Sequence, residues 1–432
     1  MIGTSVESID RAEDREQFQA FLEKLGLRQP PNGIASDAAS AFRIARDIGY
    51  PVLVRPSYVL GGRAMEIVYD DESLDRYIQD AVEASPDKPI LVDKFLEEAI
   101  EVDVDAISDG RRVVIGGVME HIEEAGIHSG DSCCVLPPHT LPREIVDEIV
   151  SATKAMALEL GVVGLMNVQY AVKGETVYVI EVNPRASRTV PFVSKAIGVP
   201  LAKLAAKAMA GRNLEELGFT EERVPEYFSV KAPVFPFNKF PGTDMLLSPE
   251  MRSTGEVMGI DPDLGYAFVK AYLAAGVDLP RSGRVLLTVK HADKRHIVGD
   301  ARALVSMGYE LLSTEGTYRV LVSNGVPVRR VNKLHEGRPH IVDLVKNGEI
   351  DLILNTPYGK QQRYDDSYIR STAVGAGIPC ITTLAGIRAV VSALAALARG
   401  PLTVRSLQSY QGASSTRCRE VSLQLNDQRS SG

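Results

Sequence analysis

Residues 165–192 read LMNVQYAVKGETVYVIEVNPRASRTVPF, and this stretch decides the fold of the first half of the chain. Apolar and mixed residues alternate along 165–172, which predicts a β-strand with one apolar and one partly polar face. The apolar side is formed by Met166, Val168, Tyr170 and Val172. A second strand is predicted over 176–183, so the two form an antiparallel hairpin.

The loop of this hairpin decides whether its polar residues meet. Gln169 and Glu181 share a face only if the loop has an odd length, because a one-residue slip turns every side chain over. A three-residue loop over 173–175 is therefore expected, with Gln169 opposite Val179 and Asn167 opposite Glu181. A two-residue turn would separate the carboxylate from the amide and exclude a shared site.

The polar residues of the hairpin suit a metal ion beside an anion. Gln169, Glu181 and Asn183 offer oxygen ligands of the kind that Mg²⁺ prefers, and Arg185 and Arg188 follow at once. This combination favours Mg²⁺-bound phosphates and a small anionic acceptor. The alternative is a solvated edge hairpin with scattered polar residues.

Composition narrows the class of protein. With 432 residues the chain is long enough for two or three domains, and its contents of 45% hydrophobic and 24% charged residues are ordinary for a globular protein. A net charge of −8 without a basic stripe argues against a nucleic-acid partner. Four cysteines form neither a zinc motif nor a disulfide framework, which favours the reducing cytoplasm. No apolar run reaches membrane-spanning length, and 389–398 is expected to be a buried helix, so no membrane partner is expected.

The order of expected elements differs between the two halves. Up to about residue 160, helices such as 10–26 and 141–160 alternate with hairpins, which predicts an α+β fold and not a doubly wound one. From about 283 a compact α/β domain with a mostly parallel sheet is expected, with one strand placed at 319–322. The Ser-, Gln- and Arg-rich end of the chain is predicted to be disordered.

Three further segments before residue 132 are candidates for nucleotide contacts. The Gly-Gly loop that ends in Arg63 is suited to phosphate, as is Arg55, although a hairpin without a ligand fits equally well. The strand 90–96 with the acids that follow it resembles a hinge for adenine and ribose; a plain core strand is the alternative. The loop 120–131 carries two histidines without metal-ligand spacing, and a loop that covers the nucleotide through His128 is favoured.

In the second half, lysines, threonines and an asparagine fall at strand ends, where open α/β sheets bind ligands. This pattern suits a phosphorylated small molecule. The candidate residues are Lys294, Thr314, Thr317, Lys333, Asn355 and Thr356.

Several motifs together resemble the carbamoyl-phosphate synthase large chain, over most of residues 1–407. They include Val54–Tyr69, Glu101–Ala106, His128–Asp131, Glu181–Arg185 and His335–His340. The Thr189–Phe192 segment and the attached α/β domain are similar to the second of that family's two synthetase halves.

The resemblance implies an ATP-grasp fold, followed by a helical and mixed segment and a small α/β domain like methylglyoxal synthase. It further implies that the chain phosphorylates carbamate to carbamoyl phosphate, with ATP as substrate and Mg²⁺ or Mn²⁺, two ions, as cofactor. Gln169, Glu181 and Asn183 would hold the metal, and Arg185 and Arg188 would be the catalytic residues that orient carbamate. The residues expected to bind ATP are Arg55, Arg63, Lys94, Leu96, Glu101, Gly126, Ile127, His128, Ser129, Gln169 and Glu181.

The resemblance also implies a regulatory site for a nucleotide monophosphate in the last domain, formed by Lys294, Thr314, Thr317, Lys333 and Asn355. Two departures matter. Pro357 stands where some members carry a hydroxyl, which leaves the effector open. Ala232 stands where ornithine-responsive members carry a carboxylate, so activation by ornithine is not expected although Glu123, Asp131 and Thr382 match.

The expected boundaries follow from the resemblance: 1–15 a remnant of a preceding domain, 16–210 the ATP-grasp domain, 211–276 the rest of the synthetic unit, 277–407 the regulatory domain and 408–432 the disordered tail. The expected partners are the glutamine-hydrolysing small subunit and the first synthetase half, in arginine and pyrimidine biosynthesis. A truncated or split large chain is the expectation. The alternatives are a catalytically silent fragment that binds ATP or an effector, and another ATP-grasp ligase like biotin carboxylase.

Overall fold

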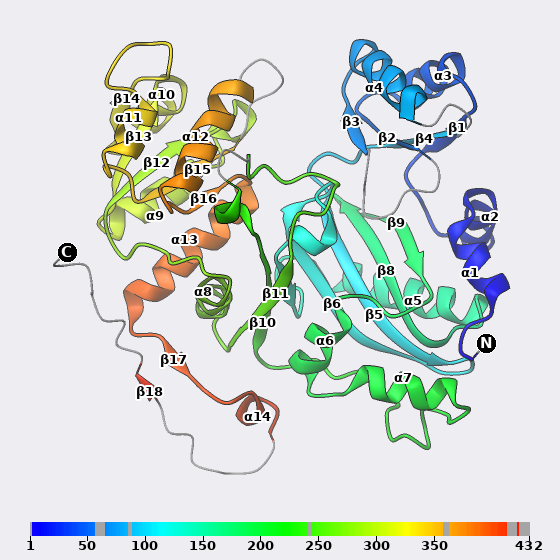
Figure 1. The fold of residues 1–432 in the computed structure, drawn as a ribbon. Helices are drawn as coiled ribbons and strands as arrows, with labels where there is room; N and C mark the ends of the chain where they lie inside the picture. The colour runs from blue at the N-terminus through cyan, green and yellow to red at the C-terminus, as the bar shows by residue number, and fades with distance from the viewer. Residues whose placement is uncertain are drawn as a thin grey trace. The chain divides into compact units, whose positions relative to one another are not determined.

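The computed structural model describes residues 2–56, 65–84, 89–240, 244–356, 363–412 and 421–422, and these divide into two compact units. The first unit comprises Met1–Ser194, Val199–Val224 and Leu247–Glu256. The second comprises Lys195–Gly198, Pro225–Leu246 and Val257–Gly432. Figure 1 shows the elements of each.

The first unit opens with helices and a small antiparallel sheet, whose strands run in the order β1-β4-β2-β3. One face of this sheet packs against α3 and α4, and buried aliphatic residues such as Val52, Val54 and Val92 form a core of its own. The elements are α1 (Val6–Glu13), α2 (Arg15–Leu25), β1 (Asn32–Ala35), α3 (Ala38–Ile48), β2 (Val52–Pro56), β3 (Glu66–Val68), α4 (Asp71–Ala84) and β4 (Ile90–Lys94).

A larger antiparallel sheet follows, in which β7-β6-β5-β8-β9 are neighbours in that order. The side chains on one face, among them Val104, Val168 and Tyr170, pack with α2 and α5 into an extensive apolar core. The opposite face carries the polar residues. The elements are β5 (Ile100–Asp109), β6 (Val113–Glu124), η1 (Ser129–Asp131), β7 (Cys134–Leu136), α5 (Arg143–Glu159), β8 (Val163–Lys173), β9 (Thr176–Asn183), α6 (Val190–Ile197) and α7 (Leu201–Met209).

The second unit is built on a parallel sheet in the order β14-β13-β12-β15-β16, as the alternation of elements predicted. The middle residues of its central strands, among them Leu286, Leu312 and Ile353, are apolar and buried, which is expected of strands covered on both faces. The elements are β10 (Phe228–Val234), η2 (Phe237–Lys239), β11 (Gly255–Asp261), α8 (Leu264–Ala274), β12 (Arg284–Thr288), η3 (Ala292–Lys294), α9 (Val298–Ser306), β13 (Glu310–Thr314), α10 (Glu315–Ser323), β14 (Arg329–Val331), α11 (Ile341–Lys346), β15 (Leu352–Asn355), α12 (Arg363–Gly375), β16 (Cys380–Ile381), α13 (Leu384–Arg399), β17 (Thr403–Val404), α14 (Leu407–Tyr410) and β18 (Val421–Ser422).

Two predicted elements are wrong. The helix expected over 10–26 is two helices, because Asp14 is extended and its carboxylate accepts the Gln17 N–H to begin α2. The strand expected at 319–322 lies in α10, where Thr317 and Leu321 are buried one helical turn apart and Glu315 pairs with Arg319.

The end of the chain is only partly described. Most of α14 falls within the predicted tail, and β18 pairs antiparallel with β17. The rest of 408–432 lies outside the described residues. Within the described part of the chain, no helix has both the length and the apolar character needed to cross a membrane.

Candidate functional site

The β8–β9 hairpin brings Gln169 and Glu181 directly opposite each other. The predicted three-residue loop is wrong: Lys173 pairs with Thr176, so the turn has two residues. A β-bulge near Ile180 then shifts the register by one residue, so that two adjacent residues of β9 escape burial before the alternation resumes. The bulge therefore restores the shared face that the turn alone would have removed.

A chain of hydrogen bonds links the polar residues at the end of β9. The Asn183 Nδ2 group donates to Glu181 Oε1 over 2.6 Å, and the Arg185 guanidinium donates to Asn183 Oδ1 over 3.0 Å. Asn183 itself lies opposite Asn167. Three of the predicted site residues thus form one connected group, and Gln169 lies across from it.

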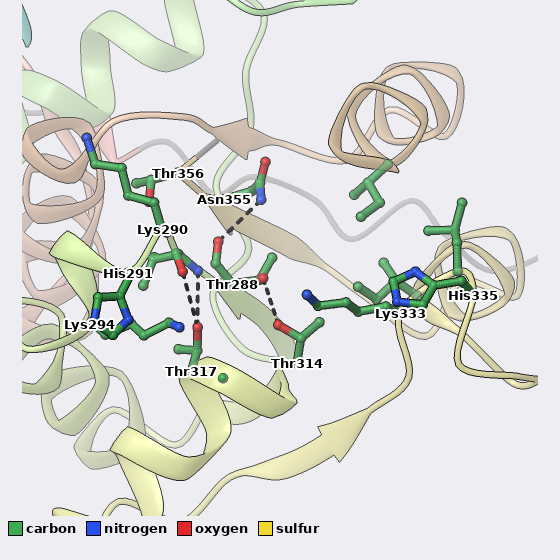
Figure 2. Close-up of a pocket in the computed structure, with 15 residues that line it drawn as sticks. Thr288, Lys290, His291, Lys294, Thr314, Thr317, Lys333, His335, Asn355 and Thr356 are labelled. Carbon is green, nitrogen blue, oxygen red and sulfur yellow. Dashed lines mark hydrogen bonds between the residues drawn. The ribbon is translucent and has the colours of Figure 1, made fainter. Parts of the chain in front are cut away.

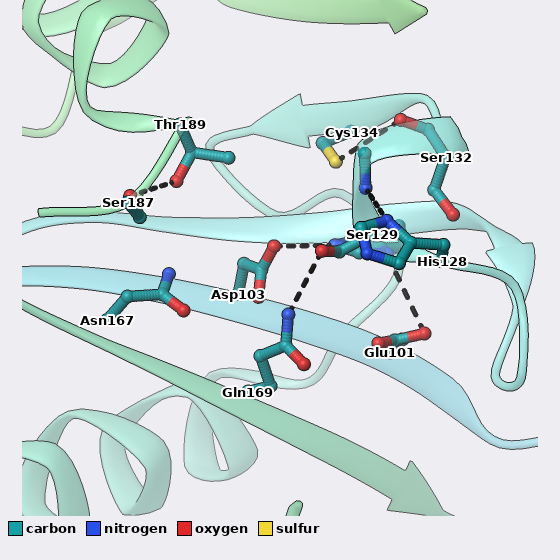
Figure 3. Close-up of polar contacts among 12 residues, drawn as sticks. Glu101, Asp103, His128, Ser129, Ser132, Cys134, Asn167, Gln169, Ser187 and Thr189 are labelled. Carbon is teal, nitrogen blue, oxygen red and sulfur yellow. Dashed lines mark hydrogen bonds and ion pairs between the residues drawn. The ribbon is translucent and has the colours of Figure 1, made fainter. Parts of the chain in front are cut away.

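The loop that was expected to cover a nucleotide reaches this group through Ser129. The Gln169 amide donates from Nε2 to Ser129 Oγ over 3.0 Å (Figure 3), which leaves the Gln169 carbonyl oxygen as its acceptor atom. The His128 ring accepts the Gly130 N–H at Nδ1, and the backbone N–H of His128 donates to the Ser248 carbonyl.

Gly126 ties this loop to the small sheet. Its φ of +100° lies in the left-handed region, and a Cβ there would stand 2.5 Å from the Phe95 ring. Only glycine fits such a close approach. Ile127 follows directly in the same loop.

The remaining predicted nucleotide residues lie on the small sheet or beside it. Arg55 on β2 has its Nε 3.5 Å from Asp93 Oδ2, and Lys94 at the end of β4 donates to the carbonyls of Gly49 and Tyr50. Burial raises the pKa of Asp93 against the opposing effect of Arg15.

Two further residues predicted to bind ATP are Leu96 and Arg63. Leu96 is buried in a small apolar cluster with Ala99 and Ala171. Arg63 lies outside the described residues.

Beneath the site, β5 presents a layer of buried acids. Glu101 was predicted to bind ATP, whereas sequence reasoning assigned no role to Asp103. Glu101 and Asp103 flank His121, with Asp103 Oδ2 3.2 Å from Nε2 and Glu101 Oε2 3.9 Å from Nδ1. Burial disfavours the charged imidazole, but Cys134 and Asp103 outweigh it and raise the pKa of His121 well above its usual range. The alternation of acid and apolar residues over 101–105 was the available signal.

The two arginines behave differently. The Arg185 guanidinium is held by Asn183 and by the carbonyl of Ala186, whereas Arg188 is exposed and contacts the sulfur of Met251. A thioether is a weak acceptor. The Arg188 guanidinium therefore retains donors for an anion.

The oxygen-rich hairpin fits a hard cation better than a transition metal. No group of three or more His, Cys, Asp or Glu side chains with metal-site geometry occurs among the described residues. Gln169, Glu181 and Asn183 supply one carboxylate and two amide oxygens, a small oxygen set of the kind that accompanies Mg²⁺ bound to phosphates.

The second unit holds a separate pocket at the carboxyl ends of its parallel strands (Figure 2). All five predicted effector residues line it, from β13, β15 and adjoining segments: Lys294, Thr314, Thr317, Lys333 and Asn355. Thr356 lines it too, and its hydroxyl accepts the Lys290 N–H over 2.9 Å. Partial burial and the nearby Lys333 lower the pKa of Lys294.

Sequence reasoning missed several residues of this pocket. His291 and His335 line it beside the lysines, and Thr288 accepts a hydrogen bond from Asn355 Nδ2 at its carbonyl (Figure 2). Their positions at the end of β12 or within a few residues of the ends of β12 and β14 were the available signal. Lysines, histidines and hydroxyls in one pocket suit a phosphorylated ligand.

Two family models match the chain. The model described as "Carbamoyl-phosphate synthase L chain, ATP binding domain" matches residues 14–217, and the MGS-like domain matches residues 296–382. These matches agree with the predicted order of an ATP-grasp fold and a methylglyoxal synthase-like domain.

Curated relatives match over almost the whole chain. The carbamoyl phosphate synthase large chain of Archaeoglobus fulgidus is 57% identical over 95% of this chain, and that of Pseudomonas aeruginosa is 56% identical over 94%. The chain spans 38% of the length of each.

A solved structure is similar in fold alone. N5-carboxyaminoimidazole synthase from Aspergillus clavatus, in complex with ADP and 5-aminoimidazole ribonucleotide, aligns with a TM-score of 0.51 and 13% identity over 64% of this chain and 75% of that one. The predicted fold class is confirmed.

Proposed function

Because the chain belongs to the family of the carbamoyl-phosphate synthase large chain, we propose that its first unit transfers the γ-phosphoryl group of ATP to carbamate. The observation that carries this proposal is the direct pairing of Gln169 with Glu181, next to Asn183 and Arg185. Oxygen ligands beside a guanidinium suit a site for nucleotide phosphates and a small anion.

The reaction balances without a proton transfer. A carbamate oxygen attacks the γ-phosphorus, the bond to the β–γ bridging oxygen breaks, and carbamoyl phosphate and ADP result. Such a transfer depends on positioning and on neutralising charge more than on a covalent participant. Arg185 and Arg188 would bind and orient the carbamate oxygens.

Gln169, Glu181 and Asn183 would hold Mg²⁺, or Mn²⁺ in its place, with two ions as the expected number. The ions would neutralise the phosphates of the nucleotide when bound. Arg55, Lys94, Leu96, Glu101 and the loop 126–129 would hold ATP.

The second unit would bind a nucleotide monophosphate as effector in the pocket of Figure 2. The lysines there suit its phosphate, and the threonine hydroxyls and Asn355 suit further polar contacts. Since the chain spans 38% of its relatives, we further propose that it acts with a first synthetase half and a glutamine-hydrolysing small subunit. Glutamine dependence and a role in arginine and pyrimidine synthesis are parts of the same proposal.

The test is the reverse reaction, in which the full chain forms ATP from MgADP and carbamoyl phosphate. Glu181→Gln should reduce ATP formation at least 1,000-fold, because the change removes the carboxylate charge of the site (about 4 kcal/mol). Glu175→Gln is the matched control, since Glu175 is an exposed glutamate in the turn of the same hairpin. Binding of MgADP without ATP formation by the unaltered chain would identify a silent nucleotide-binding fragment.

A further inference from the structure

Asp105 is a buried carboxylate to which the proposed phosphoryl transfer gives no role. It lies on β5, directly opposite Asn167 of β8, with 1% of its surface exposed. Its Oδ1 accepts from Asn167 Nδ2 at 3.0 Å and from Ser187 Oγ at 2.7 Å, and its Oδ2 accepts from Thr189 Oγ1 at 2.7 Å. All three donors are neutral, so this buried charge has polar partners but no counter-ion among them.

The donors are placed on both sides of Arg188. Ser187 and Thr189 flank it in sequence, and both side chains bond to the same carboxylate. Their hydroxyl oxygens also lie 2.7 Å from each other (Figure 3). Arg188 between them is exposed. Its backbone is thus fastened at the residue before and the residue after.

The same segment is fastened at its other end as well. Arg185 is bonded to Asn183, which lies opposite Asn167, the third donor to Asp105. Thr189 in turn accepts the Val193 N–H in the first turn of α6. Asp105 therefore stands where the strand that carries the metal residues, the arginine segment and the next helix meet.

We propose that Asp105 is a positioning residue, which fixes Arg188 for the anionic acceptor by holding the hydroxyls of Ser187 and Thr189. The proposal rests on the proposed function. A positioning role and a plain packing role predict different results. If Asp105 positions Arg188, loss of the two hydroxyl contacts should raise the KM for the anionic substrate without changing the affinity for the nucleotide.

The experiment compares Ser187→Ala/Thr189→Val, Asp105→Ala and Asp105→Asn in the full chain. The KM for carbamoyl phosphate is measured in ATP formation, and the Kd for MgADP is measured by calorimetry. The first two variants should raise the KM at least tenfold with a Kd within twofold of the unaltered chain. Asp105→Asn should stay within threefold, because the amide can still accept at Oδ1 and donate to the Thr189 oxygen.

Thr153→Val is the matched control for a buried threonine. Thr153 is fully buried on α5, against the apolar face of the same sheet, and bonds to Tyr170 and to the carbonyl of Ile149. This variant should lose stability and keep its KM. An unchanged KM in Ser187→Ala/Thr189→Val, or equal rises in KM and Kd there, would overturn the proposal, even if Asp105→Ala does not fold.

Failure of the proposed function would look different, because the unaltered chain would then form no ATP. Hydrogen exchange at the amides of residues 185–193 decides the positioning role in that case. Ser187→Ala/Thr189→Val should lose protection there by at least tenfold, and Thr153→Val should not. Equal protection in both variants would refute the anchoring.

Discussion

The candidate sites of the two units are assembled in different ways. In the first unit, Gln169 and Glu181 lie on the face of an antiparallel sheet and meet only because the register of two strands brings them opposite each other. In the second unit, the pocket residues follow the carboxyl ends of parallel strands, where neighbouring strands end side by side. The first arrangement depends on every residue between the turn and the site, and the second depends on topology alone.

The difference indicates which kind of site tolerates a change of strand register or loop length. A one-residue slip in β9 would turn Glu181 away from Gln169, and the bulge near Ile180 is what prevents it. A change of loop length in the second unit leaves the strand ends where they are. Single substitutions should therefore have large effects on the activity of the first unit and smaller, graded effects on ligand binding by the second.

The largest predicted effect tests what supports the pocket of the second unit. Arg370 has 1% of its side chain exposed, and it bonds to Asp244 through Nε and Nη2, and to Asn355 of the pocket through Nη1. Asp244→Ala should lower the free energy of unfolding by about 3–5 kcal/mol, because it leaves the buried Arg370 guanidinium without its carboxylate partner. Urea unfolding measures this.

The control for that variant is an exposed pair. The side chains of Asp71 and Arg46 form an ion pair and are 45% and 64% exposed. Asp71→Ala removes this pair and should lower the free energy of unfolding by less than about 1 kcal/mol. Equal effects of the two variants would show that the pocket is not supported by Arg370, and the contrast between the sites would weaken.

The comparison also explains what the sequence revealed. The parallel sheet, and the gathering of the five candidate residues around one pocket, were predictable because alternating strands and helices determine the topology and bring the strand ends together. The site of the first unit was predictable in its residues but not in its register: no local pattern distinguishes a three-residue loop from a two-residue turn with a bulge. The role of Asp105 could not be foreseen, because it depends on contacts across more than 60 residues of sequence.

A second prediction concerns Glu120 on β6, whose carboxylate is enclosed by backbone N–H groups of residues 139–141. Burial opposes the ionisation of Glu120. Hydrogen bonds from His139 and Thr140, together with the charge of His139, outweigh burial and lower the pKa of Glu120 to about 2. Since the pKa in the folded state is depressed, the stabilisation is present above pH 4.5 and is lost as the pH falls towards 2. Glu120→Gln should therefore cost up to about 3 kcal/mol at pH 7 and little near pH 2.5.

Unfolding of both proteins by urea at pH 7 and at pH 2.5–3 gives the comparison. A constant difference between Glu120→Gln and the unaltered chain at all pH values would contradict this assignment. It would mean that the sheet of the first unit does not rely on the charge of Glu120.

The third prediction has the opposite sign and concerns the polar face of the same sheet. Burial raises the pKa of Asp105 to about 6, against the hydrogen bonds from Thr189, Ser187 and Asn167 that favour its charged form. A raised carboxyl pKa means that the folded state binds the proton more tightly, so stability falls as the pH rises from 3.8 to 6. Asp105→Asn should gain about 3 kcal/mol relative to the unaltered chain between pH 4 and pH 7.

Urea midpoints of the two proteins measured across that range test the prediction. Parallel curves would show that the pKa of Asp105 is the same in the folded and unfolded states. The polar face of the sheet would then depend on the geometry of its hydrogen bonds and not on the charge of Asp105. A gain confined to pH 4–7 would show that the first unit keeps a carboxylate that lowers its stability.

The smallest predicted effect is at the pocket of the second unit, where several groups share the ligand. Lys333→Ala should weaken the binding of inorganic phosphate about tenfold, or about 1.4 kcal/mol, because Lys294 and the threonines remain. Loss of Lys333 also removes one of the two causes that lower the pKa of Lys294, so the remaining lysine holds its charge to higher pH. Calorimetry at two salt concentrations measures the affinity, and the variant should show the weaker salt dependence.

The control is Lys346→Ala, which changes an exposed lysine of α11 outside the pocket and should leave the affinity for phosphate unchanged. Complete loss of binding in Lys333→Ala would show that this pocket, too, depends on single atoms, and the contrast between the two sites would fail.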